Sequence, residues 1–355
     1  MSRLKLKDGS ILKFIKMKKI FGFIIIVIIF ASCSSSDSDE AYFDNPELSL
    51  HIPTDFPEVN SYVSLNKPTK YGAELGEKLF SDKRFSADNT ISCSSCHIQG
   101  NAFADHNARA IGIEGRVGLR NAPPLQNLMF LKFFNWDGSR LQLETQPLVP
   151  IITHEEMDSS ILDVIGKIKD DASYKDLFKK AFGDQEITPD RIYKSIAQFE
   201  YTLISANSKY DKVKRKEGQS FTESEAAGYA TFQQKCASCH STELFTDQSF
   251  RNIGFPLNTD SNEAGRGRVT GIPSDFMSFR VPSLRNVEYT TPYGSFGQFP
   301  TLKSVLDYFD NGVLEAENLD PIFKNNGNRI PLTEQEKENL LAFMKTLSDK
   351  DFTGN

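Results

Sequence analysis

Cys93-Ser94-Ser95-Cys96-His97 is the stretch that decides the fold of this chain, and its pattern returns as Cys236-Ala237-Ser238-Cys239-His240. Each stretch is a C-x-x-C-H motif, which is typical of covalent c-type haem attachment. The two thiols can form thioether bonds to one porphyrin edge, and the histidine can then ligate the iron. A lone C-x-x-C pair would also suit redox thiols or half of a zinc site. Two complete motifs in a chain with five cysteines and five histidines predict two bound haems.

The fifth cysteine, Cys33, follows a segment that is typical of export signals. A basic cluster at residues 16–19 precedes an apolar run at residues 20–30, which is shorter than a membrane-spanning helix. Phe30-Ala31-Ser32-Cys33 resembles a loose lipobox, so we expect residues 1–32 to be a lipoprotein signal peptide and Cys33 to carry the lipid. An uncleaved membrane anchor is the alternative. Both interpretations predict an exported protein, in the periplasm or at the cell surface, and c-type haem is attached outside the cytoplasm.

Removal of the signal would change the charge of the protein. The 355 residues carry a formal net charge of −6, and residues 1–32 hold seven of the 41 Lys/Arg and one of the 47 Asp/Glu. The remaining 34 basic and 46 acidic side chains give a net charge of −12. Such an acidic surface argues against nucleic-acid binding and permits steering of a basic redox partner.

The body of the chain predicts a mainly α fold with long irregular loops. We expect residues 33–68 to be a polar tether and an extended, proline-containing lead-in. One helix is expected at residues 71–80, and another begins after the N-cap Thr188, with Pro189 at its first position. A third is expected at residues 226–234, after the capping box Thr222-Glu223-Ser224-Glu225. A fourth begins at a capping box at Thr333 and continues to Leu347.

A weak internal repeat divides the body into two units. Gly76-x-x-x-Phe80 precedes the first C-x-x-C-H motif, and Gly228-x-x-x-Phe232 precedes the second. Ordinary helix packing could also explain these residues. With the charged stretch 209–217 as a linker, the pattern predicts two cytochrome c-like haem domains, at residues 69–208 and 209–355. Loops longer than usual connections suggest packing around cofactors.

The chain resembles the bacterial dihaem cytochrome c peroxidase family, including its methylamine-utilisation relatives, over residues 70–347. The shared motifs occur in the order of the family: the first C-x-x-C-H, Arg120-Asn121-Ala122-Pro123, Trp136-Asp137-Gly138-Ser139-Arg140, Gln146-Pro147-Leu148, Glu156-Met157, the second C-x-x-C-H, Phe279-Arg280-Val281-Pro282-Ser283-Leu284-Arg285-Asn286 and Thr291-Pro292-Tyr293. The resemblance implies reduction of hydrogen peroxide to water with electrons from a small cytochrome or copper protein. It also implies one calcium ion between the haems and allows a homodimer.

Carried over by position, the resemblance implies roles for the two histidines and the only tryptophan. His97 would be the proximal ligand of the haem that binds peroxide, and His240 that of the haem through which electrons enter. Trp136 matches the tryptophan between the two haems, although a core aromatic is the alternative. Asn121 and the carbonyls of Thr290 and Pro292 match the calcium ligands, and oxygen-only ligands suit calcium.

Gln146 and Glu156 match the polar pair over the peroxide pocket of the family. Splitting the O–O bond requires one proton to move from the near oxygen to the far one, and a carboxylate can carry it. A pocket with little water would raise the pKa of Glu156 toward that task. The alternative is a surface glutamate beside Glu155. His154 could be a second pocket base, but we favour a loop histidine.

The resemblance breaks at the distal side of the first haem. The register from Arg120 and Trp136 places the usual distal histidine at Ile113, which cannot bind iron. We therefore expect a five-coordinate first haem at rest that needs no reductive activation. His106 is a substitute only if its loop rearranges.

The sixth ligand of the second haem also departs from the family pattern. The usual methionine or tyrosine falls at Phe309, so Tyr308 could ligate only after a slip of one residue. The thioether of Met277 is another candidate for the sixth ligand. The ligand matters because its identity strongly shifts the haem potential.

Two other functions stay open from the sequence. One is a peroxide-dependent oxidase of an organic or protein-bound substrate, which a tyrosine at the second haem would favour. The other is a non-enzymatic dihaem electron carrier, but a carrier has no need of an acid–base pair such as Gln146 and Glu156.

Overall fold

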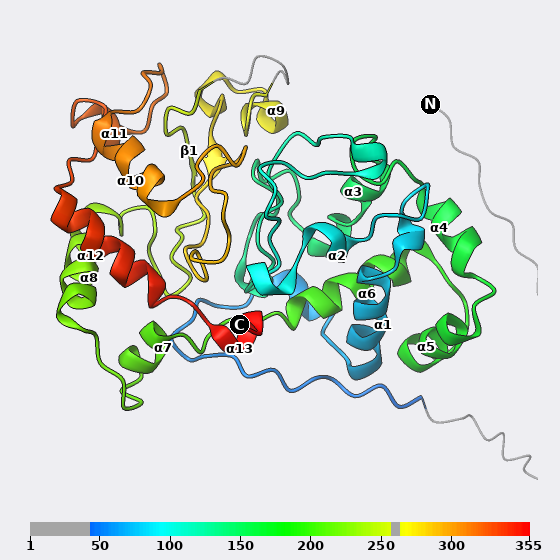
Figure 1. The fold of residues 1–355 in the computed structure, drawn as a ribbon. Helices are drawn as coiled ribbons and strands as arrows, with labels where there is room; N and C mark the ends of the chain where they lie inside the picture. Colours follow the sequence, from blue (N-terminus) through cyan, green and yellow to red (C-terminus); the bar gives the residue numbers. More distant parts are fainter. Residues whose placement is uncertain (1–42, 257–262) are drawn as a thin grey trace, which may run out of the picture. The chain divides into compact units, whose positions relative to one another are not determined.

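The computed structural model describes residues 43–256 and 263–355 (Figure 1). The predicted signal peptide at residues 1–32, the lipidation site Cys33 and the start of the tether lie outside the described residues. Within the described ranges, no helix has the length and apolar character needed to cross a bilayer.

The described chain is mainly helical, as the sequence predicts. The first half contains α1 (Lys70–Phe80), α2 (Cys93–Cys96), α3 (Leu148–Ile152), α4 (Ile161–Ile168), α5 (Ala172–Phe182) and α6 (Pro189–Tyr201). The second half contains α7 (Lys209–Lys214), α8 (Glu223–Lys235), α9 (Gly267–Thr270), α10 (Leu302–Asn311), α11 (Pro321–Lys324), α12 (Glu334–Lys345) and α13 (Lys350–Thr353). Strands β1 (Phe250–Arg251) and β2 (Phe279–Arg280) pair antiparallel, with Phe250 opposite Arg280.

The predicted helix starts are confirmed by their caps. The Thr188 side chain accepts a hydrogen bond from the Arg191 backbone, with proline at the first position of α6. Capping boxes start α8 at Thr222 and α12 at Thr333. Helix α8 starts three residues before the predicted helix, and α12 ends two residues before the predicted Leu347; helix ends vary by this much.

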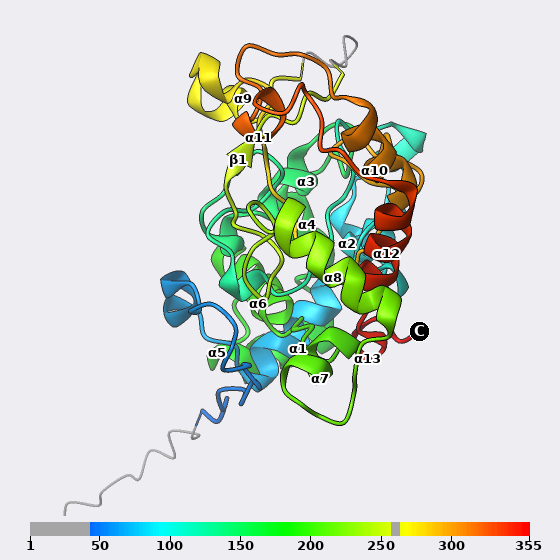
Figure 2. The same ribbon diagram turned by 90° about the vertical axis from the view of Figure 1, so that its left-hand side faces the viewer.

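Two close helix crossings give the internal repeat its structural basis. Helix α1 lies against α6 in the first half, and α8 lies against α12 in the second (Figures 1 and 2). A Cβ atom on Gly76 would stand 1.9 Å from the carbonyl oxygen of Ser195, and one on Gly228 would stand 1.9 Å from that of Asn339. Both crossings therefore need glycine, because only glycine lets two backbones approach this closely.

Phenylalanine pairs continue the repeat beside each glycine. The ring centroids of Phe80 and Phe199 are 5.2 Å apart in the first crossing, and those of Phe232 and Phe343 are 5.1 Å apart in the second. Each half thus contains the helix that precedes a C-x-x-C-H motif, packed on the last long helix of that half. This agrees with two cytochrome c-like units, while the boundaries at residues 69–208 and 209–355 stay a prediction.

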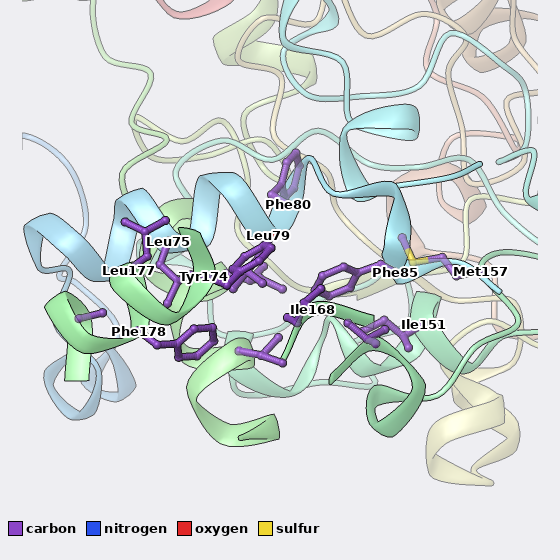
Figure 3. Close-up of a cluster of buried hydrophobic side chains, with 14 of the residues drawn as sticks. Leu75, Leu79, Phe80, Phe85, Ile151, Met157, Ile168, Tyr174, Leu177 and Phe178 are labelled. Carbon is purple, nitrogen blue, oxygen red and sulfur yellow. The ribbon is translucent and has the colours of Figure 1, made fainter. Parts of the chain in front are cut away.

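Each half also has its own apolar core. In the first half, side chains from α1, α4, α5 and α6 meet, and Figure 3 shows Leu79, Phe85 and Ile168 at the centre of this cluster. In the second half, aromatic and aliphatic side chains from α8, α10 and α12 surround the buried Phe343. Burial of such apolar surface is the main favourable contribution to folding.

A buried polar network joins the two halves. The side-chain amide of Asn286 donates hydrogen bonds to Gln126 and, over 2.9 Å, to the hydroxyl of Ser205. The side-chain oxygen Oδ1 of Asn286 accepts a hydrogen bond from the backbone N–H of Asp349 at 2.7 Å, and the Asp349 carboxylate accepts one from the Ser205 hydroxyl at 3.1 Å. Because all four side chains are buried, losing one partner would leave the others unsatisfied.

The charged stretch 209–217, expected to be a linker, is partly a packed helix. Helix α7 occupies its first residues, and the carboxylate of Asp211 forms two hydrogen bonds with the guanidinium of Arg285, at 2.7 and 2.9 Å. Both side chains are almost fully buried, with exposed fractions of 1% and 0%. The stretch therefore connects the halves as an anchored helix rather than as a solvated linker.

Replacing Gly76 with alanine is expected to destabilise the protein by about 1–3 kcal/mol or more, because the new Cβ would collide with a backbone carbonyl. The matched control is Gly166→Ala within α4, where a Cβ meets nothing within 4 Å. That control should stabilise by roughly 0.5–1 kcal/mol. Chemical unfolding of the holoprotein measures both values. Equal effects of the two substitutions would contradict the close crossing.

Candidate functional site

A cavity of about 650 Å³ opens beside the first C-x-x-C-H motif. This volume lies within the range of cofactor and ligand sites in proteins. The cavity is lined by the motif side chains Cys93, Cys96 and His97. The sequence-predicted residues Trp136, Gln146 and Glu156 line the same cavity, so the fold brings these six residues together.

A second cavity, of about 220 Å³ and mostly apolar, lies beside the second motif. Cys236, Cys239 and His240 line it. Trp136 and Asn121 line both cavities, and the indole N–H of Trp136 donates a hydrogen bond of 2.9 Å to the carbonyl of Asn121. The tryptophan therefore borders both cavities, and its role between two haems stays a prediction.

The two motif histidines are held in the same way. Nδ1 of His97 donates to the carbonyl oxygen of Phe103 over 2.7 Å, and Nδ1 of His240 donates to that of Phe245 over 3.0 Å. This fixes the tautomer in which Nε2 carries the lone pair, as iron ligation requires. Loss of hydration lowers the pKa of both histidines, so both imidazoles are neutral. Each is thus prepared to ligate a metal.

The four motif cysteines lack the lowered pKa values that are typical of reactive thiols. Loss of hydration raises the pKa of Cys96 to about 12 and that of Cys236 to about 12, and it raises the pKa of Cys93 and Cys239 as well. Reactive C-x-x-C thiols have lowered pKa values instead. Across the described ranges, no group of three or more His, Cys, Asp or Glu side chains could hold a metal ion. These findings favour thioether attachment.

An unpaired cation in the second cavity also fits a haem. Arg280 lines this cavity, and its Nε atom is buried without a hydrogen-bond partner. Loss of hydration lowers its pKa to about 10. A buried guanidinium without a partner is costly, and a bound anionic group such as a haem propionate would satisfy it.

Glu156 lines the first cavity and has a carboxyl group of raised pKa. Loss of hydration, followed by repulsion from Glu155, raises the pKa of its carboxyl group. The backbone carbonyl of Glu156 accepts the Ile113 N–H at 2.9 Å, which holds this segment against the loop that ends at Gly112. The Gln146 side chain lines the same cavity and donates to the Asn135 side chain at 3.4 Å.

The sequence resemblance places the usual distal-ligand position at Ile113, but a neighbouring part of the same segment lines the first cavity. Ile113 is buried and does not line the cavity, whereas Ile111 and Gly112 do. His106 and His154 lie outside the cavity, with side chains 64% and 66% exposed. His154 contacts Arg116 and Asp158, so it is a loop histidine, as the sequence analysis favours. His97 is thus the only histidine that the described chain places at this cavity.

Comparisons with known proteins agree with these features. Residues 70–219 match the family described as di-haem cytochrome c peroxidase. A methylamine utilization protein MauG from Methylophilus methylotrophus is 31% identical over 288 residues, which cover 79% of this chain and 84% of the relative. The chain belongs to the dihaem cytochrome c peroxidase family. Cytochrome c551 peroxidase from Nitrosomonas europaea is 34% identical over 279 residues, which cover 78% of this chain and 79% of that relative.

A solved structure supports the fold of this dihaem peroxidase family member. The crystal structure of a MauG-like protein associated with microbial copper homeostasis superposes with a TM-score of 0.77 at 29% identity. The superposition covers 86% of this chain and 97% of that one. Membership of the dihaem family implies two c-type haems, in agreement with the two cavities.

The sixth-ligand candidates of the second haem are not placed at its cavity. The hydroxyl of Tyr308 donates to the carbonyl oxygen of Gly254 over 2.6 Å, and Phe309 rather than Tyr308 lines the cavity. Met277 is buried but does not line the cavity either. A different thioether, that of Met344, does line it. Met344 was not among the ligands predicted from the sequence, although it lies one helical turn after the apolar Leu340.

The calcium ligands implied by the resemblance meet at the second cavity. Asn121, Thr290 and Pro292 all line it. These residues offer neutral oxygen atoms, which suit calcium, but no carboxylate belongs to the predicted set. The Asn121 amide nitrogen already donates to the carbonyl oxygen of Asn107 at 2.9 Å. The calcium site stays a proposal.

The oxidised protein is expected to show a high-spin ferric component in its electron paramagnetic resonance spectrum. The reason is that, among the described residues, His97 is the one histidine that lines the first cavity, so no second histidine would ligate a haem iron there. His106→Ala and His154→Ala should leave that component unchanged. Two purely low-spin haems would contradict the open first site.

Tyr308→Phe is expected to leave the absorption spectrum of the second haem unchanged, because the hydroxyl is bonded to Gly254. The loss of that hydrogen bond should cost about 0.5–1.5 kcal/mol of unfolding free energy. Absorption spectra and thermal unfolding of the same samples measure the two effects. A shifted spectrum would instead show that the tyrosine ligates the iron.

Proposed function

We propose that this protein is an exported dihaem peroxidase that reduces hydrogen peroxide to water with electrons from a small redox protein. The observation that carries the proposal is the position of Glu156 and Gln146 in the cavity of the first haem motif. An electron carrier has no use for a carboxyl group of raised pKa at a site without a second histidine.

A haem held by Cys93, Cys96 and His97 would supply the iron at which peroxide exchanges electrons. Glu156 would take a proton from one oxygen of the peroxide and deliver it to the other, which would leave as water. Gln146 positions the peroxide through its amide. In total, one peroxide consumes two electrons and two protons and yields two water molecules.

Trp136 offers the route between the two sites, because it lines both cavities. In this proposal, electrons from the donor protein enter at the side of His240 and reach the first cavity through this tryptophan. Lipid attachment at Cys33, export, a calcium ion between the haems and a homodimer belong to the same proposal and rest on the sequence alone.

The oxidase of an organic or protein-bound substrate is the weaker candidate. A tyrosine at the second haem would have favoured it, and the Tyr308 hydroxyl is bonded to the carbonyl of Gly254 instead. Anaerobic titration of the fully reduced protein with hydrogen peroxide tests for an enzyme of either type. Reduced haems that peroxide does not oxidise would favour the function of a non-enzymatic electron carrier. Adding a reduced small cytochrome then tests the peroxidase, which should turn over.

Glu156→Gln is expected to slow the reaction with peroxide by about 10²–10⁴-fold, because the proton carrier is lost. The control is Glu155→Gln, which removes the adjacent carboxylate and should keep most of the rate. In the unchanged protein, the rate should fall as the pH decreases through the raised pKa of Glu156, because only the ionised form accepts the proton. Stopped-flow absorption measures these rates. Equal rates in both variants would remove Glu156 from the mechanism.

A further inference from the structure

Glu200 is a buried carboxyl group at the first haem cavity that the proposed reaction does not use. It lies near the end of α6, is 3% exposed, and lines the same cavity as Cys93 and His97. Its Oε2 atom is buried and has no hydrogen-bond partner among the described residues. An unpartnered acid in such a place is costly, so its persistence calls for a physical role.

The internal repeat shows which residue of the second half corresponds to Glu200. In the first crossing, Ser195 and Phe199 of α6 lie against Gly76. In the second crossing, Asn339 and Phe343 of α12 lie against Gly228 in the same way. The same register pairs Ile196 with Leu340 and Glu200 with Met344. Ile196 and Glu200 line the first cavity, and Leu340 and Met344 line the second. One face of α6 thus lines the first cavity, and the equivalent face of α12 lines the second. The two residues that α12 contributes are apolar, whereas α6 contributes one apolar residue and one glutamate.

The surroundings of Glu200 favour its neutral form. Loss of hydration and repulsion from Glu144, on the turn at Leu143–Thr145, raise its pKa to about 8. The other titratable groups near it are the hydroxyl of Tyr201, which donates to Glu144, and the thiol of Cys93, which a haem would consume. Ionisable side chains elsewhere around the same cavity are Arg109, Arg120, Asp137, Glu155, Glu156 and Arg268.

We propose that Glu200 is a redox-linked proton site of the first haem. Where the pH is high enough for Glu200 to be ionised, its carboxylate takes up one proton from solvent when that haem gains one electron from the donor. When the electron leaves, the proton returns to solvent. The two charges would interact strongly because Glu200 is buried at the same cavity, where screening by solvent is weak. The coupling keeps the net charge of the buried site constant through each electron transfer.

This inference rests on haem attachment at Cys93 and Cys96 and does not require that the protein reduces peroxide. Its readout is a midpoint potential, which can be measured in either case. Failure of the peroxidase proposal and failure of this one are therefore distinguishable. The second haem provides a control inside the same molecule, because Met344 cannot titrate.

The test is spectroelectrochemical titration of both haems as a function of pH. In the unchanged protein, the potential of the first haem should fall as the pH rises above the pKa of Glu200, because proton release then opposes reduction. The fall should approach about 59 mV for each tenfold decrease in proton concentration. The potential of the second haem should depend less on pH over the same range.

Glu200→Gln should flatten the pH dependence of the first haem and leave that of the second unchanged. Glu200→Met copies the residue of the second half and should have the same effect, so it replaces the first variant if that one loses haem. Glu144→Gln should keep the slope of the potential of the first haem against pH. The fall should begin at lower pH, because loss of the Glu144 charge removes its repulsion and lowers the pKa of Glu200. Unchanged pH dependence in both Glu200 variants would overturn the proposal.

Discussion

The close approach of two helix backbones, repeated once in each half, is the constraint on which the rest of this structure depends. At Gly76 and at Gly228, the backbone of one helix meets a carbonyl oxygen of its partner with no room for a side chain. Helix α8 ends where the second C-x-x-C-H motif begins, and α1 lies shortly before the first. The crossings therefore set where each motif, and with it each haem, is held against the last long helix of its half.

Polar contacts then tie the two halves to each other. The network around Asn286 provides such ties, because Asn286 and Asp349 of the second half form hydrogen bonds with Gln126 and Ser205 of the first. Arg120 adds ion pairs of 2.8 Å to Asp137 and to Glu263. Breaking a buried charged pair on one side leaves an uncompensated charge, so such contacts hold the halves in a unique arrangement. That arrangement places Trp136 at both cavities.

The two haem sites share their construction and differ in their chemistry. Both histidines donate to a nearby carbonyl, and both cavities are closed by one face of a long helix. The first cavity is larger and holds two carboxyl groups of raised pKa, Glu156 and Glu200. The second is smaller and mostly apolar. These differences suit proton-coupled chemistry at the first site and electron transfer at the second.

Much of this was determined by the sequence alone, because it depends on local chemistry. The haem motifs follow from thiol and imidazole spacing, and the starts of α6, α8 and α12 follow from their capping residues. The repeated glycines predicted the crossings only weakly, since glycine and phenylalanine at this spacing also suit ordinary packing. The resemblance placed Gln146, Glu156 and Trp136 in one site, and the fold brings all three to one cavity.

Tertiary structure alone decided which neighbouring residues reach a cavity. Ile111 rather than Ile113, and Phe309 rather than Tyr308, line the haem cavities, because loop conformation and a hydrogen bond to Gly254 set these directions. The burial of Glu200 was also beyond the sequence. A glutamate one turn after Ile196 looks like a break in an apolar stripe, and only packing against a distant motif turns it into a buried acid, because desolvation depends on neighbours far along the chain.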